Sequence, residues 1–375
     1  MEVLHVYSGN LFGGIETLLV TLAQQRSLYP PMQPHFALCF EGRLATEIRA
    51  TGLCVQMLGK VRSSQPWTVW LARRQLHQLL RQQQFDVVIC HSCWSQAIFG
   101  SVVRSHHLPL VFWCHDTPKG NHWLERWAKQ TPPDFVIANS RYTLAAMPKL
   151  YPRICGDVLY SPVPCPNISN LAEIRGAVRA ELNTPDNTVV IIQASRLEPL
   201  KGQIALLLAL AQQHDIPAWV CWIAGGVQRP QEAQYLQKLH TQVQKLGIAD
   251  RVQFLGQRAD VSRLLAAADI YCQPNIEPET FGIAFVEALY AGLPVVTTAI
   301  GGGLEIVDES CGRLVAPNDA NALSQVLRLL ITNSGERADL AAKGSARAYQ
   351  LCDPARQLTQ LHALLSRLVK QEAVA

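Results

Sequence analysis

Short apolar runs alternate with stretches of helical periodicity along almost the whole chain. Strands that alternate with helices are typical of parallel sheets covered by helices on both faces. The pattern therefore predicts an α/β protein with two doubly wound, Rossmann-like domains. Six candidate strands fall in each half: 3–7, 36–40, 55–58, 87–90, 110–113, 135–138, 189–194, 220–224, 252–255, 270–273, 295–298 and 313–315.

Prolines mark the border between the two halves. Pro162, Pro164 and Pro166 occupy every second position, which favours a stiff, extended connector without a helix. We therefore place an N-terminal domain at 1–163 and a C-terminal domain at 164–353. The remaining segment, 354–375, is expected to form a last helix.

Composition limits the class of protein. The 375 residues are enough for two cores, and no apolar run is long enough to span a bilayer. The first residues enter a strand directly, so we expect no signal peptide and a cytoplasmic protein. Several of the eleven cysteines lie within expected strands, which favours buried free thiols over disulfides. These are Cys39, Cys90, Cys114, Cys221 and Cys272.

Charge is spread unevenly. Residues 1–163 contain 15 Lys and Arg against 9 Asp and Glu, whereas the rest contains 18 against 20. Two accounts fit this asymmetry: a basic domain that faces an anionic partner, or ordinary scatter of surface charge. No nucleic-acid partner is expected.

Two carboxylates flank the start of an apolar helix in the second half. Glu279 follows the strand at 270–273, in a loop at its carboxyl end, where open α/β sheets bind ligands. Glu287 stands eight positions later and interrupts a helix surface that is otherwise apolar. A solvated glutamate on an amphipathic helix is the alternative for an isolated pair of this kind.

A second segment carries two cations. Arg196 and Lys201 flank the turn between the strand at 189–194 and an apolar helix that starts near Ile204. The amides and dipole of a helix N-terminus favour an anion. A guanidinium adds bidentate contacts and a lysine adds a mobile charge. This combination suits a diphosphate, although exposed loop residues would give the same pattern.

Together the two segments resemble the Glu-x7-Glu signature of the retaining, nucleotide-sugar-dependent glycosyltransferases of the GT-B type (glycosyl transferases group 1, family 4). The resemblance covers nearly the whole chain. It implies two Rossmann-like domains facing across a cleft, with the last helix returning to the N-terminal domain. It also implies that the diphosphate of the donor is held by Arg196 and Lys201, the sugar by Glu279, Phe281 and Gly282, and the ribose by Glu287.

The first half supplies further candidates. Gly13 and Gly14 precede an expected helix without dinucleotide-fingerprint spacing. They resemble the family's loop over the donor phosphates, and a plain tight turn is the alternative. His115, at the end of the strand at 110–113, resembles a histidine that meets the donor sugar and the reacting centre; a structural histidine is the alternative. Asp116 either orients His115 or caps the following turn.

Other chemistry in the first half is less specific. The segment from Cys90 to Cys93 invites a zinc interpretation, but no second cysteine pair completes a site, and we expect no metal. The stretch 67–81 is an amphipathic basic helix, either a membrane-surface element or a helix packed on the sheet. Its residues include Trp67, Trp70, Leu71, Arg73, Arg74, His77 and Arg81. An aromatic segment at 113–127 could face a sugar acceptor or pack in the core.

These features predict a metal-independent hexosyltransferase-like enzyme with His115 and Glu279 as catalytic residues. The donor is a substrate, so no cofactor is expected. The resemblance implies that the acceptor is a glycan or a lipid-linked sugar, as in polysaccharide or glycolipid synthesis, and the basic first half fits contact at the inner face of the membrane. The alternatives are a non-catalytic scaffold, a related epimerase or phosphorylase, and a dinucleotide-dependent oxidoreductase, which the glycine spacing disfavours.

Overall fold

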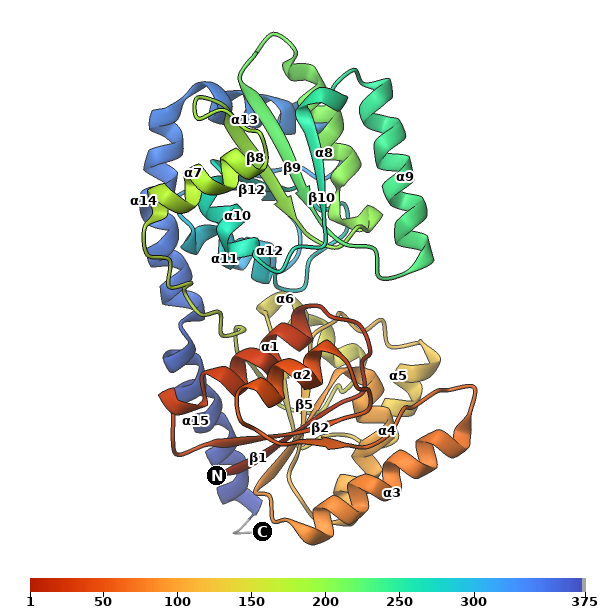
Figure 1. Cartoon of the computed structure of the whole chain (residues 1–375). Coiled ribbons are helices and arrows are strands. Elements are labelled where there is room, and N and C mark those ends of the chain that lie inside the picture. The colour runs from red at the N-terminus through yellow and green to blue at the C-terminus, as the bar shows by residue number, and fades with distance from the viewer. Residues whose placement is uncertain (373–375) are drawn as a thin grey trace. The chain divides into compact units, whose positions relative to one another are not determined.

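The computed structural model describes the backbone of residues 1–372 (Figure 1). The chain divides into two compact units. Unit 1 consists of Met1–Pro164 and the described residues from Cys352 onward, and unit 2 is Cys165–Leu351. Among the described residues, no helix combines the length and apolar composition that crossing a membrane requires.

Unit 1 is built on a seven-stranded parallel sheet with the order β3-β2-β1-β4-β5-β6-β7. Its strands are β1 (Glu2–Tyr7), β2 (Gln33–Leu38), β3 (Val55–Met57), β4 (Val87–His91), β5 (Leu110–Cys114), β6 (Phe135–Ala138) and β7 (Gly156–Val158). Its helices are α1 (Gly14–Gln24), α2 (Arg43–Ala50), α3 (Pro66–Gln82), α4 (Ser92–Ser105), α5 (Trp123–Ala128), α6 (Arg141–Ala146) and α15 (Pro354–Glu372).

Both faces of this sheet are buried. Neighbouring residues of each strand point to opposite faces, and each face packs against its own helices. Val3 and Tyr7 of β1 pack with residues of α1 and α2, whereas Leu4 and Val6 pack with residues of α3 and α4. The last helix, α15, joins the first of these clusters. It contributes Leu358, Leu361, Leu365 and Leu368.

Unit 2 contains a six-stranded parallel sheet with the order β10-β9-β8-β11-β12-β13. Its strands are β8 (Val189–Ala194), β9 (Trp219–Ala224), β10 (Val252–Gly256), β11 (Ile270–Gln273), β12 (Val295–Thr298) and β13 (Gly312–Val315). Its helices are α7 (Leu171–Glu181), α8 (Gln203–Leu210), α9 (Pro230–Lys245), α10 (Val261–Ala267), α11 (Ile283–Tyr290), α12 (Gly303–Ile306), α13 (Ala320–Thr332) and α14 (Ser334–Cys352).

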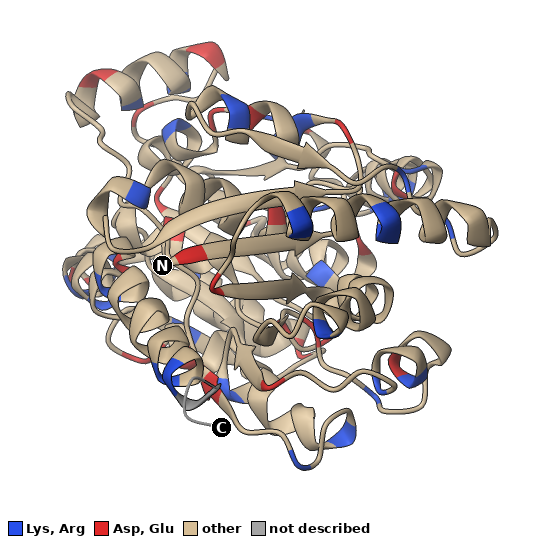
Figure 2. Ribbon diagram, turned by 90° about the horizontal axis from the view of Figure 1, so that it is seen from below, with Lys and Arg blue, Asp and Glu red and all other residues tan. Residues whose placement is uncertain are grey.

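The predicted two-domain α/β fold is confirmed, and each of the twelve predicted strands corresponds to an observed one. The sequence missed β7, a three-residue strand at the edge of its sheet. The strands carry few charged residues (Figure 2), as expected for sheets buried on both faces. The five cysteines expected inside strands, or at their ends, are all buried free thiols.

The amino ends of β8 and β11 are joined by a buried arginine that the sequence did not suggest. Arg179 of α7 is 1% exposed and donates to Asp269 Oδ2 at 2.7 Å. The same oxygen accepts the backbone N–H of Val190 at 2.7 Å. These bonds fix the two central strands of unit 2 at the end opposite to the candidate site.

Candidate functional site

The strand order of unit 2 reverses between β8 and β11. From β8 the chain continues to β9 and β10 on one side, and from β11 it continues to β12 and β13 on the other. The segments that follow these two strands leave in opposite directions, which opens a crevice at their carboxyl ends. Lys201 follows β8 and Glu279 follows β11, so both candidates belong to this edge.

The turn after β8 is pressed against the loop after β11. Gly202 has φ +74° and precedes α8, and a Cβ at this position would lie 1.8 Å from the Pro274 carbonyl oxygen. Only glycine fits there. The backbone N–H of Ile276 donates to the Leu200 carbonyl at 3.0 Å, which joins the two segments directly.

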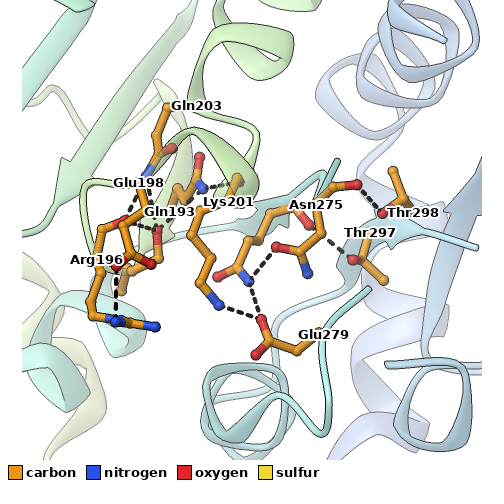
Figure 3. Close-up of polar contacts among 12 residues, drawn as sticks. Gln193, Arg196, Glu198, Lys201, Gln203, Asn275, Glu279, Thr297 and Thr298 are labelled. Carbon is orange, nitrogen blue, oxygen red and sulfur yellow. Dashed lines mark hydrogen bonds and ion pairs between the residues drawn. The ribbon is translucent and has the colours of Figure 1, made fainter. Parts of the chain in front are cut away.

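An ion pair connects the two predicted residues across this junction. Lys201 Nζ lies 2.5 Å from Glu279 Oε2, and the side chains are only 11% and 18% exposed (Figure 3). Gln273 Nε2 donates to the same carboxylate oxygen at 3.3 Å. Gln193 Nε2 donates to the Lys201 carbonyl at 2.7 Å. Both members of the ion pair are therefore held by a further hydrogen bond, Glu279 through its carboxylate and Lys201 through its backbone carbonyl.

Polar residues that the sequence analysis missed continue this network (Figure 3). Gln273 Nε2 also donates to Asn275 Oδ1 at 3.0 Å. Thr297 and Thr298 donate to the carbonyls of Gln273 and Asn275 at 2.9 and 2.6 Å. A signal for this network was present in the sequence, because Gln193 and Gln273 are polar residues near the ends of two strands, β8 and β11, that are otherwise apolar. Both side chains are almost fully buried.

The backbone of Glu279 is fixed separately from its side chain. Gly302 N–H donates to the Glu279 carbonyl at 2.6 Å, and Glu279 and Gly301 form an isolated parallel bridge. Gly301 has φ +72°, and a Cβ on it would lie 2.4 Å from the Glu279 carbonyl oxygen. The loop that carries Glu279 therefore requires glycine opposite it.

Phe281 and Gly282 lie immediately before α11, and Glu287 lies within it. Phe281 is buried, and Gly282 has φ +105°, with Phe285 so close that a Cβ would lie 2.4 Å from its ring. Glu287 is partly buried, and this burial raises its pKa to about 7. A carboxyl that changes charge near neutral pH is typical of functional sites.

Arg196 lies in the turn between β8 and α8, where its side chain is exposed to solvent. Its Nη1 donates to Glu198 Oε1 at 2.9 Å, and its side chain is 42% exposed. The Arg196 carbonyl accepts from Gln203 Nε2 at 2.9 Å, which ties the turn to α8. The structure thus brings Lys201 to Glu279 and pairs Arg196 with Glu198 instead.

The remaining candidates belong to unit 1. Gly13 precedes α1, and its N–H donates to Glu16 Oε2 at 2.8 Å. The other carboxylate oxygen of Glu16 accepts the Tyr7 hydroxyl at 2.5 Å. Glu16 therefore anchors the loop that contains Gly13 and Gly14 to the end of β1. Neither Tyr7 nor Glu16 was expected in this role.

His115 directly follows β5 and is 8% exposed. Burial lowers its pKa to about 3, so the imidazole is neutral. The ring contacts His91, whose Nδ1 lies 3.1 Å from His115 Nε2. His91 was not expected beside His115, and the two roles considered for Asp116 stay predictions. Among the described residues, no group of three or more His, Cys, Asp or Glu side chains could hold a metal ion.

Comparisons with known proteins agree with this architecture. The family described as "Glycosyl transferases group 1" matches residues 175–347, and "Glycosyltransferase Family 4" matches residues 12–160. The solved structure of Anabaena HepE in complex with UDP-glucose is 26% identical, with a TM-score of 0.84, and the alignment covers 98% of this chain and 100% of HepE.

Two curated relatives match part of the chain. D-inositol 3-phosphate glycosyltransferase of Stackebrandtia nassauensis is 33% identical over 44% of this chain and 39% of its own length. GDP-mannose-dependent monoacylated alpha-(1-6)-phosphatidylinositol monomannoside mannosyltransferase of Corynebacterium glutamicum is 33% identical over 46% of each. The chain therefore spans less than half the length of these relatives.

The raised pKa of Glu287 predicts a pH-dependent cost in stability. A carboxyl whose pKa is higher in the folded protein destabilises the fold increasingly as pH rises, here from about 4.5 to about 7. We expect Glu287→Gln to raise the free energy of unfolding at pH 8 by on the order of 1–2 kcal/mol, and to have little effect near pH 4.5. Thermal unfolding at both pH values checks this.

Glu309→Gln, at an exposed position of the same unit, is the matched control. A gain for Glu287→Gln that does not grow with pH, or an equal gain for the control, would contradict burial as the cause.

Proposed function

The chain belongs to the glycosyltransferases of the GT-B type, and we propose that it transfers a sugar from a nucleoside-diphosphate donor to an acceptor hydroxyl, with retention at the anomeric carbon. The ion pair between Lys201 and Glu279, at the point where the strand order reverses, is the observation that carries this proposal. UDP-glucose is the first donor to test because HepE binds it, and GDP-mannose is the second because the Corynebacterium relative depends on it.

The chemical problem is the charge on the leaving group. The bond between the anomeric carbon and a diphosphate oxygen breaks, and its electron pair stays on that oxygen. The acceptor oxygen then bonds to the anomeric carbon and releases its proton, for which the leaving phosphate oxygen is the natural acceptor. Lys201, Arg196 and the first amides of α8 would stabilise the growing negative charge. We propose that these groups take the place of a metal ion.

Glu279 and Glu287 have separate tasks in this proposal. Glu279 and the backbone at Phe281 and Gly282 orient the sugar, while Glu287 accepts hydrogen bonds from the ribose hydroxyls. Without donor, Glu279 neutralises Lys201, and a partly buried ammonium needs such a partner. The donor diphosphate must therefore share Lys201 with Glu279 or displace it. Gly13, Gly14 and His115 remain candidate donor contacts of unit 1, on the resemblance and their places after β1 and β5.

Donor binding and turnover test the function together. A donor that binds only the folded protein raises its unfolding temperature. We expect UDP-glucose or GDP-mannose to do so, and NAD not to. We also expect slow release of the nucleoside diphosphate with water as the acceptor, in EDTA as well as in Mn²⁺.

The outcomes separate the alternatives. Donor binding without release of nucleoside diphosphate, even when sugar acceptors are added, would indicate a non-catalytic scaffold. Activity lost in EDTA and restored by Mn²⁺ would show that Lys201 and Arg196 do not replace a metal. Binding of NAD would favour an oxidoreductase.

The two glutamates should affect different kinetic constants. Glu279→Gln is expected to lower kcat roughly 100-fold while leaving UDP bound at least as tightly, because it frees the charge of Lys201. Glu287→Ala should raise the donor KM roughly 10-fold with little change in kcat, since ribose contacts are nearly equal in ground and transition states. Steady-state kinetics and calorimetric titration with UDP check both. The reverse order would overturn these roles.

An exposed surface of α3 fits an anionic membrane. It consists of Trp67, Trp70, Leu71, Arg74 and Arg81, and we call it the α3 patch. The three apolar side chains are 60%, 59% and 48% exposed, and Arg74 stacks over Trp70 with 5.7 Å between guanidinium and ring. The other side of α3 packs in the core. We propose peripheral contact at the inner face of the membrane, beside a glycan or lipid-linked acceptor.

Arg73 does not belong to this patch, although the sequence grouped it there. Its Nε donates to the Ile98 carbonyl at 2.6 Å and its Nη2 to the Ala97 carbonyl at 3.3 Å. The desolvation of this half-buried guanidinium lowers its pKa. Arg73 therefore ties α3 to α4, and its substitution would disturb the fold as well as the charge.

Binding to vesicles tests the α3 patch. Each Lys or Arg near an anionic surface contributes about 1 kcal/mol, so Arg74→Gln with Arg81→Gln should weaken binding to phosphatidylglycerol vesicles roughly 10-fold or more at low salt. Binding of the unsubstituted protein should fall steeply with salt. Lys238→Gln with Lys245→Gln, which removes the same charge from the exposed side of α9, is the control. Indifference to anionic vesicles at low salt would favour a soluble acceptor.

A further inference from the structure

Three histidines form a continuous chain of ring contacts beneath the carboxyl edge of the unit 1 sheet. His5 lies in β1, His91 ends β4 and His115 follows β5, and these three strands are neighbours. His5 Nδ1 is 2.9 Å from His91 Nε2, and His91 Nδ1 is 3.1 Å from His115 Nε2. Exposed fractions of 1%, 0% and 8% place the three rings almost entirely inside the protein.

The interior keeps all three rings neutral. His5 stacks on Phe36, and His91 and His115 both stack on Trp113. Desolvation lowers the pKa of His5 and of His115 to about 3, and the pKa of His91 falls well below its ordinary value for the same reason. Each ring therefore carries one proton near pH 7.

A neutral imidazole has one N–H donor and one acceptor nitrogen. In this row of three histidines, the nitrogen that carries the proton on one ring determines which nitrogens carry it on the other two. Either the N–H groups point from His5 toward His115, or they all point from His115 toward His5. The first arrangement leaves a bare Nε2 on His5 and a proton on Nδ1 of His115. The second leaves an N–H on His5 Nε2 and a bare Nδ1 on His115.

The buried end of the chain selects between these arrangements. His5 Nε2 is buried and has no hydrogen-bond partner. A buried N–H without an acceptor is rarer in proteins than an unpaired acceptor. His5 also lines a small cavity whose walls include Arg26, and a positive charge nearby favours a lone pair over an N–H. Both arguments place the bare nitrogen at the His5 end.

We propose that His5 and His91 are positioning residues that hold His115 with its proton on Nδ1, so that the ring offers an N–H donor to its ligand. His5 Nδ1–H donates to His91 Nε2, and His91 Nδ1–H donates to His115 Nε2. His115 Nδ1 makes no hydrogen bond within the described residues. Of the two unpaired ring nitrogens it belongs to the less buried ring, so it is the one placed to meet a ligand.

This inference rests on the proposed function only for the identity of the ligand, an oxygen of the donor sugar. A neutral His115 whose Nδ1 already carries a proton cannot remove one from the acceptor hydroxyl. It can donate a hydrogen bond to a sugar oxygen and fix the orientation of the sugar. The structure therefore assigns His115 a donor role rather than that of a general base.

The tautomers are directly measurable in the protein without donor. Histidine labelled with ¹⁵N distinguishes protonated from bare ring nitrogens by chemical shift, and single substitutions assign each ring. Between pH 6 and pH 8 we expect protons on Nδ1 of His5, His91 and His115, with all three Nε2 bare. A proton on Nε2 of His115 would overturn the proposal. This measurement does not depend on any enzymatic activity.

A kinetic test addresses positioning. His91→Phe keeps an aromatic ring beside Trp113 but removes both hydrogen bonds. Loss of such a supporting partner typically costs 10–100-fold, so we expect a fall of roughly that size in kcat with UDP-glucose and little change in KM. His91→Gln, which keeps a donor and an acceptor, should recover part of it. His240→Phe, at an exposed position of α9, is the control, and thermal unfolding verifies that each variant is folded.

The results separate this inference from the proposed function. If His91→Phe is folded and turns over UDP-glucose like the unsubstituted protein, His91 does not position His115. If the unsubstituted protein uses no nucleotide sugar but shows the expected tautomers, the histidine chain stands and the proposed function fails.

Discussion

One contact between opposite charges determines how the candidate site of unit 2 is arranged. Lys201 and Glu279 follow the two neighbouring strands at which the strand order reverses, 78 residues apart in the chain. The backbone leaves that point in opposite directions, and the two segments are joined there by the backbone bond from Ile276 to Leu200 and by this ion pair. Gly202 allows the two loops to approach, Gly301 allows the segment after β12 to lie against Glu279, and the buried Gln273 donates to the carboxylate. The starts of α8 and α11 are positioned by the same loops.

The two units handle polar groups at their strand ends differently. In unit 2 a partly buried ammonium is balanced by a carboxylate, so the site is charged and already paired before any ligand arrives. Under the proposed function, a donor with phosphate groups must compete with Glu279 for Lys201, which would couple binding of the diphosphate to the position of this carboxylate. In unit 1 the histidine chain is neutral, and its polarity lies in the direction of its hydrogen bonds.

Much of the fold, and the position of Lys201 and Glu279 at the carboxyl edge of the unit 2 sheet, could be predicted because both depend on local patterns. Parallel strands buried on two faces are nearly continuous apolar runs, which made twelve strands visible. The edge strand β7 (Gly156–Val158) was missed because Gly156 and Asp157 leave it one apolar residue. Single polar residues such as Asn275 and Thr298 resemble ordinary turn residues in a sequence. Their contacts depend on which strands are neighbours. Arg196 instead pairs with Glu198 within one turn, although its charge, its place before a helix and the resemblance all pointed to a phosphate.

The three histidines show most clearly why a pattern in the sequence does not by itself reveal which residues meet in the fold. His5, His91 and His115 are far apart in the sequence. His5 attracts no attention in an apolar strand, and His91 drew notice only as part of the Cys90–Cys93 segment with its zinc interpretation. The order β1-β4-β5 brings them together, because Tyr7 is the register partner of His91, and His91 is the partner of Trp113. Each ring thus follows its neighbour by about two residues along the sheet, a diagonal that lets one imidazole reach the next. Burial then removes the option of charge, and a chain of neutral rings has only two internal states. The unpaired Nε2 of His5 makes one of these two states more stable. His5, within β1, therefore determines whether Nδ1 of His115 carries a proton.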